Sequence, residues 1–237
     1  MDVQVGKEFE FARTGQGSHE LRANHIRAFK AGDDDQFLRH ALSALQRGPI
    51  RFRRNNVIAC EGDAADYIFL VVGGIVRSCK TFKNGNRNVV AFYLPGALFG
   101  WSDQKYSLSV EAASDAMVLF FKRKALASVA ARENRVASFL LELATLELRR
   151  AQEHALLMSR SAKCRVAAFL TDLSKRSGGT GLLSLPMSHQ DIADHLGLTI
   201  ETLSRAITGL ERSGLVARVS HRTLMVRNDR SLSHLMD

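Results

Sequence analysis

The stretch Ser188–Gly214, with the sequence SHQDIADHLGLTIETLSRAITGLERSG, decides the fold of the C-terminal part of the chain. Ser188 is a favourable helix N-cap, and Asp191 lies three residues later, where an acidic side chain can complete the cap. Gly197 can form a tight turn because glycine adopts positive φ at little cost. Thr199 can cap a second helix, which Gly214 would end. The stretch therefore predicts two short helices joined by a tight turn.

The second of these helices has one apolar face and one polar face. The apolar residues recur at helical spacing and predict a buried face of Leu203, Ala206, Ile207 and Leu210. The exposed N-terminal half carries Ile200, Glu201, Ser204 and Arg205, where a recognition helix would reach base edges in a major groove. An ordinary helical hairpin with a solvated face would share most of these signals. Small Ala193 at a fixed distance before the turn favours a DNA-binding helix-turn-helix.

Composition limits the classes of protein to consider. The chain has 237 residues, enough for one large domain or two ordinary ones, and 46% apolar residues can supply a core. A net charge of +9 and an isoelectric point of about 9.9 favour a polyanionic partner. There is no run of about 18 apolar residues and no apolar signal segment, so we expect no membrane association. Three widely separated cysteines fit a reducing environment, which predicts a cytoplasmic protein.

The N-terminal half divides into an extension and a β-domain. Residues 1–35 are polar and predict a weakly ordered extension, and a β-domain is expected over residues 36–130, beginning with a short helix at Gln36–Gln46. Short strands then alternate with turns, and Asn84-Gly85 is a strong hairpin signal. The strand region should begin near Ile50, and the expected strands are Val57–Cys60, Tyr67–Val72, Ile75–Phe82, Val89–Leu94 and Ser109–Phe121. This spacing predicts a small antiparallel roll or barrel.

A long helix should follow, in a segment assigned to residues 131–160. Glu133–Ser159 contains neither proline nor glycine. Its apolar stripe consists of Val136, Leu140, Leu143, Leu146 and Leu157. Such a seam predicts pairing with the same helix of a second copy, and therefore a homodimer. The alternative is that the helix lies along its own β-domain, and both arrangements can hold at once.

Residues 161–237 form the expected DNA-binding domain. A helix is expected at Ala162–Leu173, and after the helix-turn-helix a hairpin of Leu215–Val219 and Thr223–Arg227 should form a wing. Basic and hydroxyl side chains near the helix starts and at the wing tip can contact phosphate, which positions a protein without reading sequence. These phosphate candidates are Ser188, His189, Thr199, Thr202, His221 and Arg222.

The order of β-roll, long helix and winged helix-turn-helix resembles the Crp/Fnr superfamily of bacterial transcription regulators over about residues 36–228. Gly73–Val76 and Leu94–Gly100 look like that family's nucleotide-binding fold, and Lys163–Leu173 looks like its post-hinge helix. Glu201-Thr-Leu-Ser-Arg205 resembles the reading helix of the Fnr and FixK branch. The resemblance implies an α+β fold and a DNA-binding homodimer that recruits RNA polymerase, with no enzymatic activity.

The same resemblance implies roles for the reading residues. The family branch implies an inverted repeat of the kind TTGAT-N4-ATCAA. Arg205 should then donate to guanine, Glu201 should accept from cytosine, and Ser204 should tune the neighbouring position. The exposed loop from Lys83 to Asn88 is a candidate contact for RNA polymerase.

Departures from the family pattern indicate the subgroup. An N-terminal iron–sulfur cluster is excluded because the first cysteine is Cys60. Cyclic AMP binders have a Glu after Phe-Gly and an Arg-Ser or Arg-Thr pair, whereas here Trp101 follows Phe99-Gly100 and Tyr106-Ser107 stands at the pair. No Arg or Lys occurs from Tyr106 to Phe121, and a buried phosphate without a cation is strongly disfavoured. These features predict a FixK-like regulator without a cofactor.

The alternative function is a sensor gated by cyclic AMP, by another small ligand or by haem. Haem would need an axial ligand, and no spacing singles out one of His19, His25, His40 and His154. Cys164 is a candidate redox residue because Lys163 and Arg165 could lower its thiol pKa if the thiol were exposed, although a buried packing role is the alternative. No metal-ligand spacing, phosphate-cradling glycine loop or nucleophile elbow occurs, so an enzyme is not expected.

Overall fold

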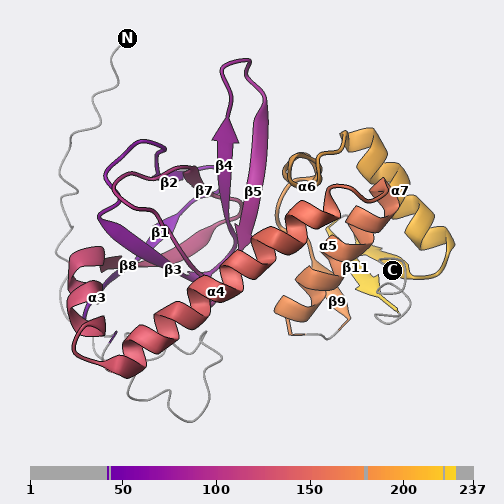
Figure 1. Cartoon of the computed structure of the whole chain (residues 1–237). Helices are drawn as coiled ribbons and strands as arrows, with labels where there is room; N and C mark the ends of the chain where they lie inside the picture. The colour runs from indigo at the N-terminus through magenta and orange to yellow at the C-terminus, as the bar shows by residue number, and fades with distance from the viewer. Residues whose placement is uncertain (1–41, 43, 179–180, 221, 228–237) are drawn as a thin grey trace.

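A computed structural model describes residues 42, 44–178, 181–220 and 222–227 (Figure 1). The expected extension at residues 1–35 lies outside this range, as does most of the helix expected at Gln36–Gln46. The end of that helix prediction is wrong, because Gln46 is the first residue of a strand. Gly48 and Pro49 lie within this strand and conceal it from a pattern search, since proline and glycine are rare inside strands.

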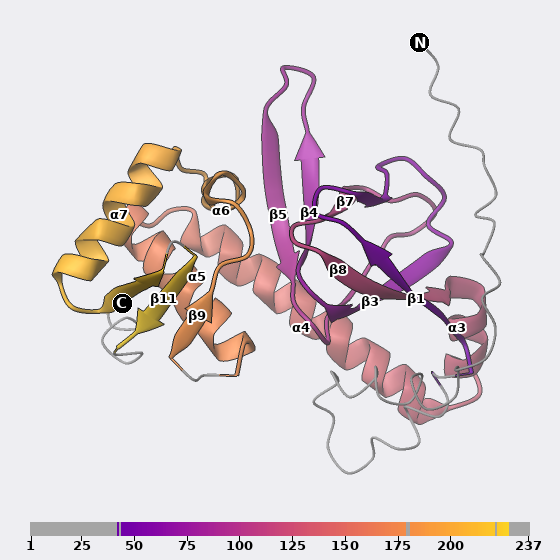
Figure 2. The same ribbon diagram turned by 180° about the vertical axis from the view of Figure 1, so that it is seen from behind.

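The N-terminal domain is a roll of two four-stranded antiparallel sheets. Its strands are β1 Gln46–Phe52, β2 Val57–Ala59, β3 Tyr67–Gly73, β4 Val76–Thr81, β5 Arg87–Tyr93, β6 Leu98–Phe99, β7 Ser109–Ala112 and β8 Ala116–Lys122. One sheet has the order β1-β8-β3-β6 and the other has the order β2-β7-β4-β5. Ser109–Phe121, expected as one strand, is two, and β6 was not predicted. The β4–β5 hairpin projects beyond the rest of the roll (Figures 1 and 2).

Aromatic side chains fill the interior of the roll. Phe69 stacks on Phe99 with ring centroids 5.0 Å apart, and Phe99 stacks on Tyr93 at 4.9 Å. Phe69 also contacts Tyr106 and Phe120 at centroid distances of 5.8 and 5.1 Å. Phe99 is fully buried. This is the packed core that the alternating apolar pattern requires, and it occupies the space between the two sheets.

Two helices follow the roll: α3 Arg123–Ala130 and α4 Asn134–Leu157. The long helix α4 runs under the roll and on to the C-terminal domain (Figures 1 and 2). Val136 on α4 is fully buried and belongs to a cluster with Leu119 and Leu126. Leu140 and Leu143 pack against the same cluster.

The structure therefore corrects the predicted dimer seam. Val136 has no exposed surface with which to meet a partner, so its assignment to a dimer interface is wrong. Leu146 and Leu157 are half-buried and continue the same helical face as Leu140 and Leu143. Val136, Leu140 and Leu143 pack on their own protomer, as in the alternative considered for this helix, whereas a dimer contact through Leu140, Leu143, Leu146 and Leu157 stays a prediction. Different leucines of α4 are exposed, namely Leu141 (69%), Leu148 (59%) and Leu156 (73%).

The C-terminal domain consists of three helices and a three-stranded sheet. Its elements are α5 Ala162–Arg176, β9 Leu182–Ser184, α6 His189–Leu196, α7 Ile200–Arg212, β10 Val216–Ser220 and β11 Thr223–Val226. The strand order is β10-β11-β9, so the wing hairpin extends a sheet edge. This arrangement is a winged helix-turn-helix.

A single apolar cluster joins the roll to the C-terminal domain. Val89 and Phe92 on β5 belong to the same buried cluster as Phe169 on α5 and Leu196 on α6. The rings of Phe92 and Phe169 lie 6.0 Å apart. Helix α6 lies beside strand β5, across this junction (Figures 1 and 2). The first helix of the helix-turn-helix therefore packs against the β4–β5 hairpin.

Candidate nucleic-acid interface

The start of α6 has the predicted capping box. The Ser188 hydroxyl oxygen accepts a hydrogen bond from the Asp191 N–H at 3.0 Å, and the Asp191 carboxylate accepts from the Ser188 N–H at 3.1 Å. Gly197 ends the helix in the left-handed conformation with φ of 60°. The guanidinium of Arg165 on α5 donates to the Leu196 carbonyl at 2.9 Å and so satisfies an acceptor at the helix end. The predicted turn is confirmed.

The second helix, α7, exposes its predicted reading face. Thr199 caps the helix, because its hydroxyl oxygen accepts from the Thr202 N–H at 3.2 Å. The predicted apolar face of Leu203, Ala206, Ile207 and Leu210 is buried. Glu201, Ser204 and Arg205 are all exposed on the N-terminal part of the helix. The chain thus presents three polar side chains on one exposed helical surface.

The charges on this surface suit hydrogen bonding to base edges. The pKa of Glu201 lies below its ordinary value because of a hydrogen bond from its own backbone N–H, a hydrogen bond from Thr199 and the charge of Arg205. Glu201 is therefore an ionised acceptor at neutral pH. Arg205 lies one turn later and supplies only donors. An acceptor and a donor array side by side can read a cytosine and a guanine, respectively.

The residues predicted to contact phosphate differ in their exposure to solvent. Thr199 and Arg222 are exposed, whereas Ser188, His189 and Thr202 are half-buried. The hydroxyl oxygens of Ser188 and Thr199 accept hydrogen bonds from the backbone in the two caps, and the same side chains hydrogen-bond the carboxylates of Asp191 and Glu201. Both lie at helix N-termini, where partial positive charge favours an anion. His221 lies outside the described residues.

The position that binds the cyclic phosphate in cyclic AMP receptors is differently built here. Tyr106 is 6% exposed; its hydroxyl donates to the Tyr67 carbonyl at 2.8 Å and accepts from the Tyr67 N–H at 3.2 Å. Arg123 is the closest arginine to this region in sequence, and its guanidinium donates to the backbone carbonyl of Asp103 at 2.6 Å. These groups are committed to the protein's own backbone.

Cys164 does not meet the condition for a reactive thiol. It is 7% exposed and is one of the buried residues of α5, the helix whose Val166 and Ala167 belong to the apolar cluster. Sequence proximity to Lys163 and Arg165 does not expose the sulfur, so burial favours a packing role.

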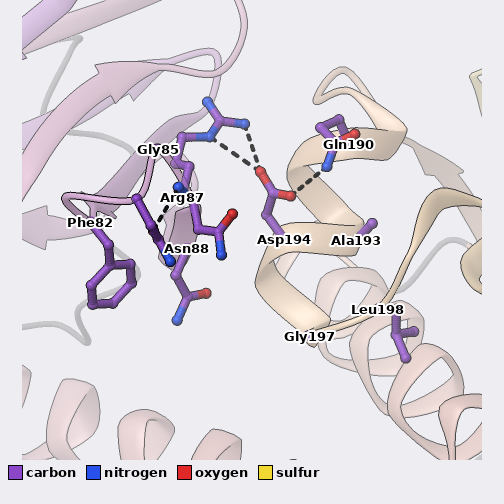
Figure 3. A pocket seen from close by; sticks show the side chains of 11 residues that line it. Phe82, Gly85, Arg87, Asn88, Gln190, Ala193, Asp194, Gly197 and Leu198 are labelled. Carbon is purple, nitrogen blue, oxygen red and sulfur yellow. Dashed lines mark hydrogen bonds and ion pairs between the residues drawn. The ribbon is translucent and has the colours of Figure 1, made fainter.

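Sequence reasoning missed the polar contacts between α6 and the roll. The carboxylates of Asp191 and Asp194 on α6 form ion pairs with Arg77 and Arg87 of the β4–β5 hairpin. Beside these pairs lies a cleft of about 680 Å³, lined on one side by the hairpin and on the other by α6 and the turn after it. Figure 3 shows Arg87 reaching across this cleft to Asp194. Asp191 was predicted only as a helix cap, and no local signal paired it with residues a hundred positions earlier.

The described residues also bear on metal binding and on membrane insertion. Within the part of the chain that the structure describes, no group of three or more His, Cys, Asp and Glu side chains could hold a metal ion. No helix in the same part is long and apolar enough to cross a membrane.

Known proteins resemble both halves of the chain. The family model for the Crp-like helix-turn-helix domain matches residues 164–235, and that for the cyclic nucleotide-binding domain matches residues 49–133. The nitrogen fixation regulation protein FixK of Azorhizobium caulinodans is 42% identical over 194 residues, covering 79% of this chain and 78% of that protein. FixK of Rhizobium meliloti is 39% identical over 201 residues, covering 83% and 92% of the two chains. The chain belongs to the FixK-like group of Crp/Fnr regulators.

A solved structure also supports the assignment of this protein to the FixK-like regulators. FixK2 from Bradyrhizobium japonicum is 38% identical, with a TM-score of 0.75 over 79% of this chain and 96% of that one. A CRP-family regulator of Thermus thermophilus, 21% identical with a TM-score of 0.64, shares the fold. The protein is a DNA-binding transcription regulator and not an enzyme.

Proposed function

We propose that this FixK-like regulator is an activator that binds an Fnr-type inverted repeat, TTGAT-N4-ATCAA, as a homodimer without cyclic AMP or an iron–sulfur cluster. The observation that carries the proposal is the exposed Glu201, Ser204 and Arg205 on the capped start of α7. Arginine pairs with guanine O6 and N7, and a carboxylate accepts from cytosine N4. Ser204 would contact the neighbouring base. In each TTGAT half-site, Arg205 and Glu201 would thus read the guanine and the cytosine of the single G·C pair.

Dimerisation through α4 is supported by its exposed leucines. Leu141 and Leu148 are seven residues apart, and Leu156 lies close to the same helical face two further turns on. Exposed large apolar side chains at heptad spacing are typical of a coiled-coil seam. The half-buried Leu140, Leu143, Leu146 and Leu157 would support this seam from behind. Two paired α4 helices would place two copies of α7 for successive major grooves.

Independence from cyclic AMP is supported by the interior of the roll. Phe69, Phe99 and Tyr93 stack where the two sheets face each other. Trp101 and Tyr106 replace the charged residues that a cyclic nucleotide requires. A nucleotide phosphate at the position of Tyr106 would meet a tyrosine hydroxyl and no arginine side chain, and an unpaired buried charge is strongly unfavourable.

Recruitment of RNA polymerase is supported by the projecting hairpin. Residues 83–86 at the tip of the β4–β5 hairpin are all exposed. The tip stands clear of the roll (Figure 1). A relative in Rhodopseudomonas palustris, 38% identical over 72% of this chain, carries the name transcriptional activatory protein AadR. An activator needs such a protein surface in addition to its DNA-binding face.

The decisive experiment is selection of bound DNA from a random pool with purified protein and no added ligand. The proposal expects enrichment of two TTGAT half-sites in inverted orientation at one fixed spacing. Enrichment only after cyclic AMP or haem is added would instead establish a ligand-gated sensor. Enrichment of a lone half-site would contradict dimeric recognition.

A further inference from the structure

Arg77 connects the roll to the helix-turn-helix through a buried cluster of charges. It lies on β4 and is only 3% exposed. Its guanidinium donates to the Asp191 carboxylate at 2.8 Å, to Glu111 on β7 at 2.6 Å and to the Asn55 side-chain oxygen at 3.1 Å. Asp191 is 114 residues away along the chain and is itself 1% exposed. One side chain thus holds three separate segments together.

Arg87, on the second strand of the hairpin, forms ion pairs with the same helix, α6. Its guanidinium donates to the other Asp191 oxygen at 2.6 Å and to Asp194 at 3.0 Å, as Figure 3 shows for Asp194. Each oxygen of Asp191 therefore accepts from a different arginine of the β4–β5 hairpin. Bonds of this kind, between ionised partners, are strong and geometrically specific.

Asp191 is also the residue that fixes the start of α6. Its carboxylate accepts from the Ser188 N–H in the capping box while it accepts from the two arginines. The turn at Gly197 joins α6 to α7, and Leu196 and Leu203 of the two helices belong to one buried cluster. The hairpin is therefore tied to the first turn of α6, and through α6 to the orientation of the reading helix.

Further hydrogen bonds at this junction also hold the C-terminal domain against the β4–β5 hairpin. The ring N–H of His195 on α6 donates from Nδ1 to the Val89 carbonyl at 3.0 Å. Arg176 at the end of α5 donates to the Phe92 carbonyl at 2.7 Å. Both acceptors belong to β5, so the helix-turn-helix domain is hydrogen-bonded to this strand at two separate positions. The junction therefore combines a buried apolar cluster with hydrogen bonds between defined pairs of residues.

We propose that Arg77 and Arg87 are positioning residues for DNA binding, which clamp α6 to the β4–β5 hairpin in the orientation that a two-half-site operator requires. The inference rests on the proposed dimeric function. The attraction within a buried ion pair is usually offset by the cost of removing both charges from water. Such a network is therefore better suited to defining one geometry than to adding stability. Glu201, Ser204 and Arg205 stay exposed while the clamp is closed, so the clamped arrangement leaves the reading face open.

The clamp matters because two recognition helices must be spaced correctly. Centres of half-sites lie about 34 Å apart, one turn of DNA. Pairing of α4 would fix the two rolls relative to each other. The contacts of each roll with its own α6 would then fix the distance and angle between the two copies of α7. Loosening the clamp should reduce the match between protein and operator spacing without altering the contacts that one α7 makes with one half-site.

The test uses the full-length protein with paired substitutions. Arg87→Ala/Asp194→Ala removes both members of a partly exposed pair, and Arg77→Met/Asp191→Asn removes the charge of both members of the buried pair. In the second variant Glu111 loses Arg77 and keeps Arg87 as its cationic neighbour, at 3.9 Å. Arg51→Ala is the matched control, because Arg51 forms an exposed ion pair with Asp115 within the roll. Affinity is measured for the operator, for DNA with one half-site and for an operator with one extra base pair between half-sites. Circular dichroism establishes that each variant is folded.

We expect both clamp variants to lose about tenfold or more in operator affinity, while affinity for the single half-site changes by less than about threefold. Their preference for the correct spacing should also shrink, and Arg51→Ala should behave as the wild type. Unchanged operator affinity in the folded Arg87→Ala/Asp194→Ala variant would overturn the proposal. Equal losses on both DNAs, or tighter operator binding, would overturn it as well. Failure of the wild-type protein to distinguish operator from half-site would instead refute the dimeric function.

Discussion

His154 of α4 stacks on His195 of α6, with ring centroids 4.3 Å apart and ring planes 16° apart. The second ring also packs edge-on against Phe92 and Phe169, at centroid distances of 5.1 and 5.7 Å. A long helix, a DNA-binding helix and a strand of the roll therefore meet at one neutral imidazole pair. We therefore expect the junction between the domains to be sensitive to acid.

The first prediction concerns that sensitivity. Burial, followed by the charge of His154, lowers the pKa of His195 from 6.5 to about 4. Between these values the unfolded chain binds a proton that the folded chain does not. The stabilisation is therefore fully present above pH 6.5 and is lost as the pH falls toward 4, by an amount on the order of 3 kcal/mol. Denaturant unfolding at a series of pH values measures the slope.

A variant distinguishes the contribution of His195 to the pH dependence of stability from that of the carboxylates, which also titrate in acid. His195→Gln retains an N–H donor for the Val89 carbonyl but cannot be protonated in this range. Its unfolding free energy should change less between pH 6.5 and 4.5 than that of the wild type. The pKa of Asp191 is also lowered, since hydrogen bonds from Ser188 and the charge of Arg77 outweigh the opposing effect of burial. That contribution is lost below its unfolded value of 3.8, in a separate window. Identical slopes for the two proteins would refute the role of His195.

The second prediction distinguishes the two faces of α4. Leu148→Arg places a charge in the proposed seam, on a side chain that is 59% exposed in the protomer. It should yield folded monomers that lose operator binding, as measured by sedimentation velocity. Leu143→Arg is the matched variant on the opposite face. Because Leu143 packs on the core of its own roll, this change should lower the melting temperature substantially. A dimeric Leu148→Arg protein would place the interface elsewhere.

The third prediction concerns cyclic AMP. The purified regulator should bind its operator without the nucleotide, and saturating cyclic AMP should leave both affinity and melting temperature unchanged. A ligand that bound only the folded protein would raise its melting temperature, so the thermal measurement detects binding even without an effect on DNA. A tenfold gain in operator affinity, which corresponds to about 1.4 kcal/mol of coupling, would show that the roll binds the nucleotide despite Trp101 and Tyr106.

Local signals explain which parts of the structure the sequence could predict. The caps at Ser188 and Thr199 and the turn at Gly197 depend only on residues within a few positions, and the structure confirms all three. The face of α4 that meets a partner was predicted wrongly at Val136. Periodicity reveals an apolar face, but packing on the roll and packing on a second copy both select leucine. Burial in the protomer is needed to tell these two faces apart.

Long-range charge pairs were beyond prediction for a different reason. Arg77 lies in a strand whose neighbours are polar and apolar in turn, so it has the sequence pattern of a solvated side chain. Its burial follows from the approach of α6, which supplies Asp191 from 114 residues away. No pattern of short period encodes such a pair. The candidate clamp could be recognised only after the roll and the helix-turn-helix were placed together.

The last prediction tests direct readout by α7. Arg205→Ala removes a donor array from an exposed position in the second turn of the helix, so folding should be unaffected. A bidentate pair with guanine discriminates by about 1–3 kcal/mol at each half-site. The variant should therefore lose most of its preference for the operator over DNA in which the half-site guanines are replaced. Glu201→Ala should relax the preference at one base pair. Competition binding at fixed salt measures both effects.

Arg222→Ala provides the control, because Arg222 is exposed at the wing and is proposed to contact phosphate. A phosphate contact carries no sequence information, so this variant should weaken binding to all DNA sequences alike. It should also reduce the dependence of affinity on salt, since fewer counterions are released on binding. Arg205→Ala should change the salt dependence less than it changes the preference for the operator. If Arg205→Ala instead weakened binding equally to operator and substituted DNA, Arg205 would be a phosphate contact, and the Fnr-type reading of this helix would be wrong.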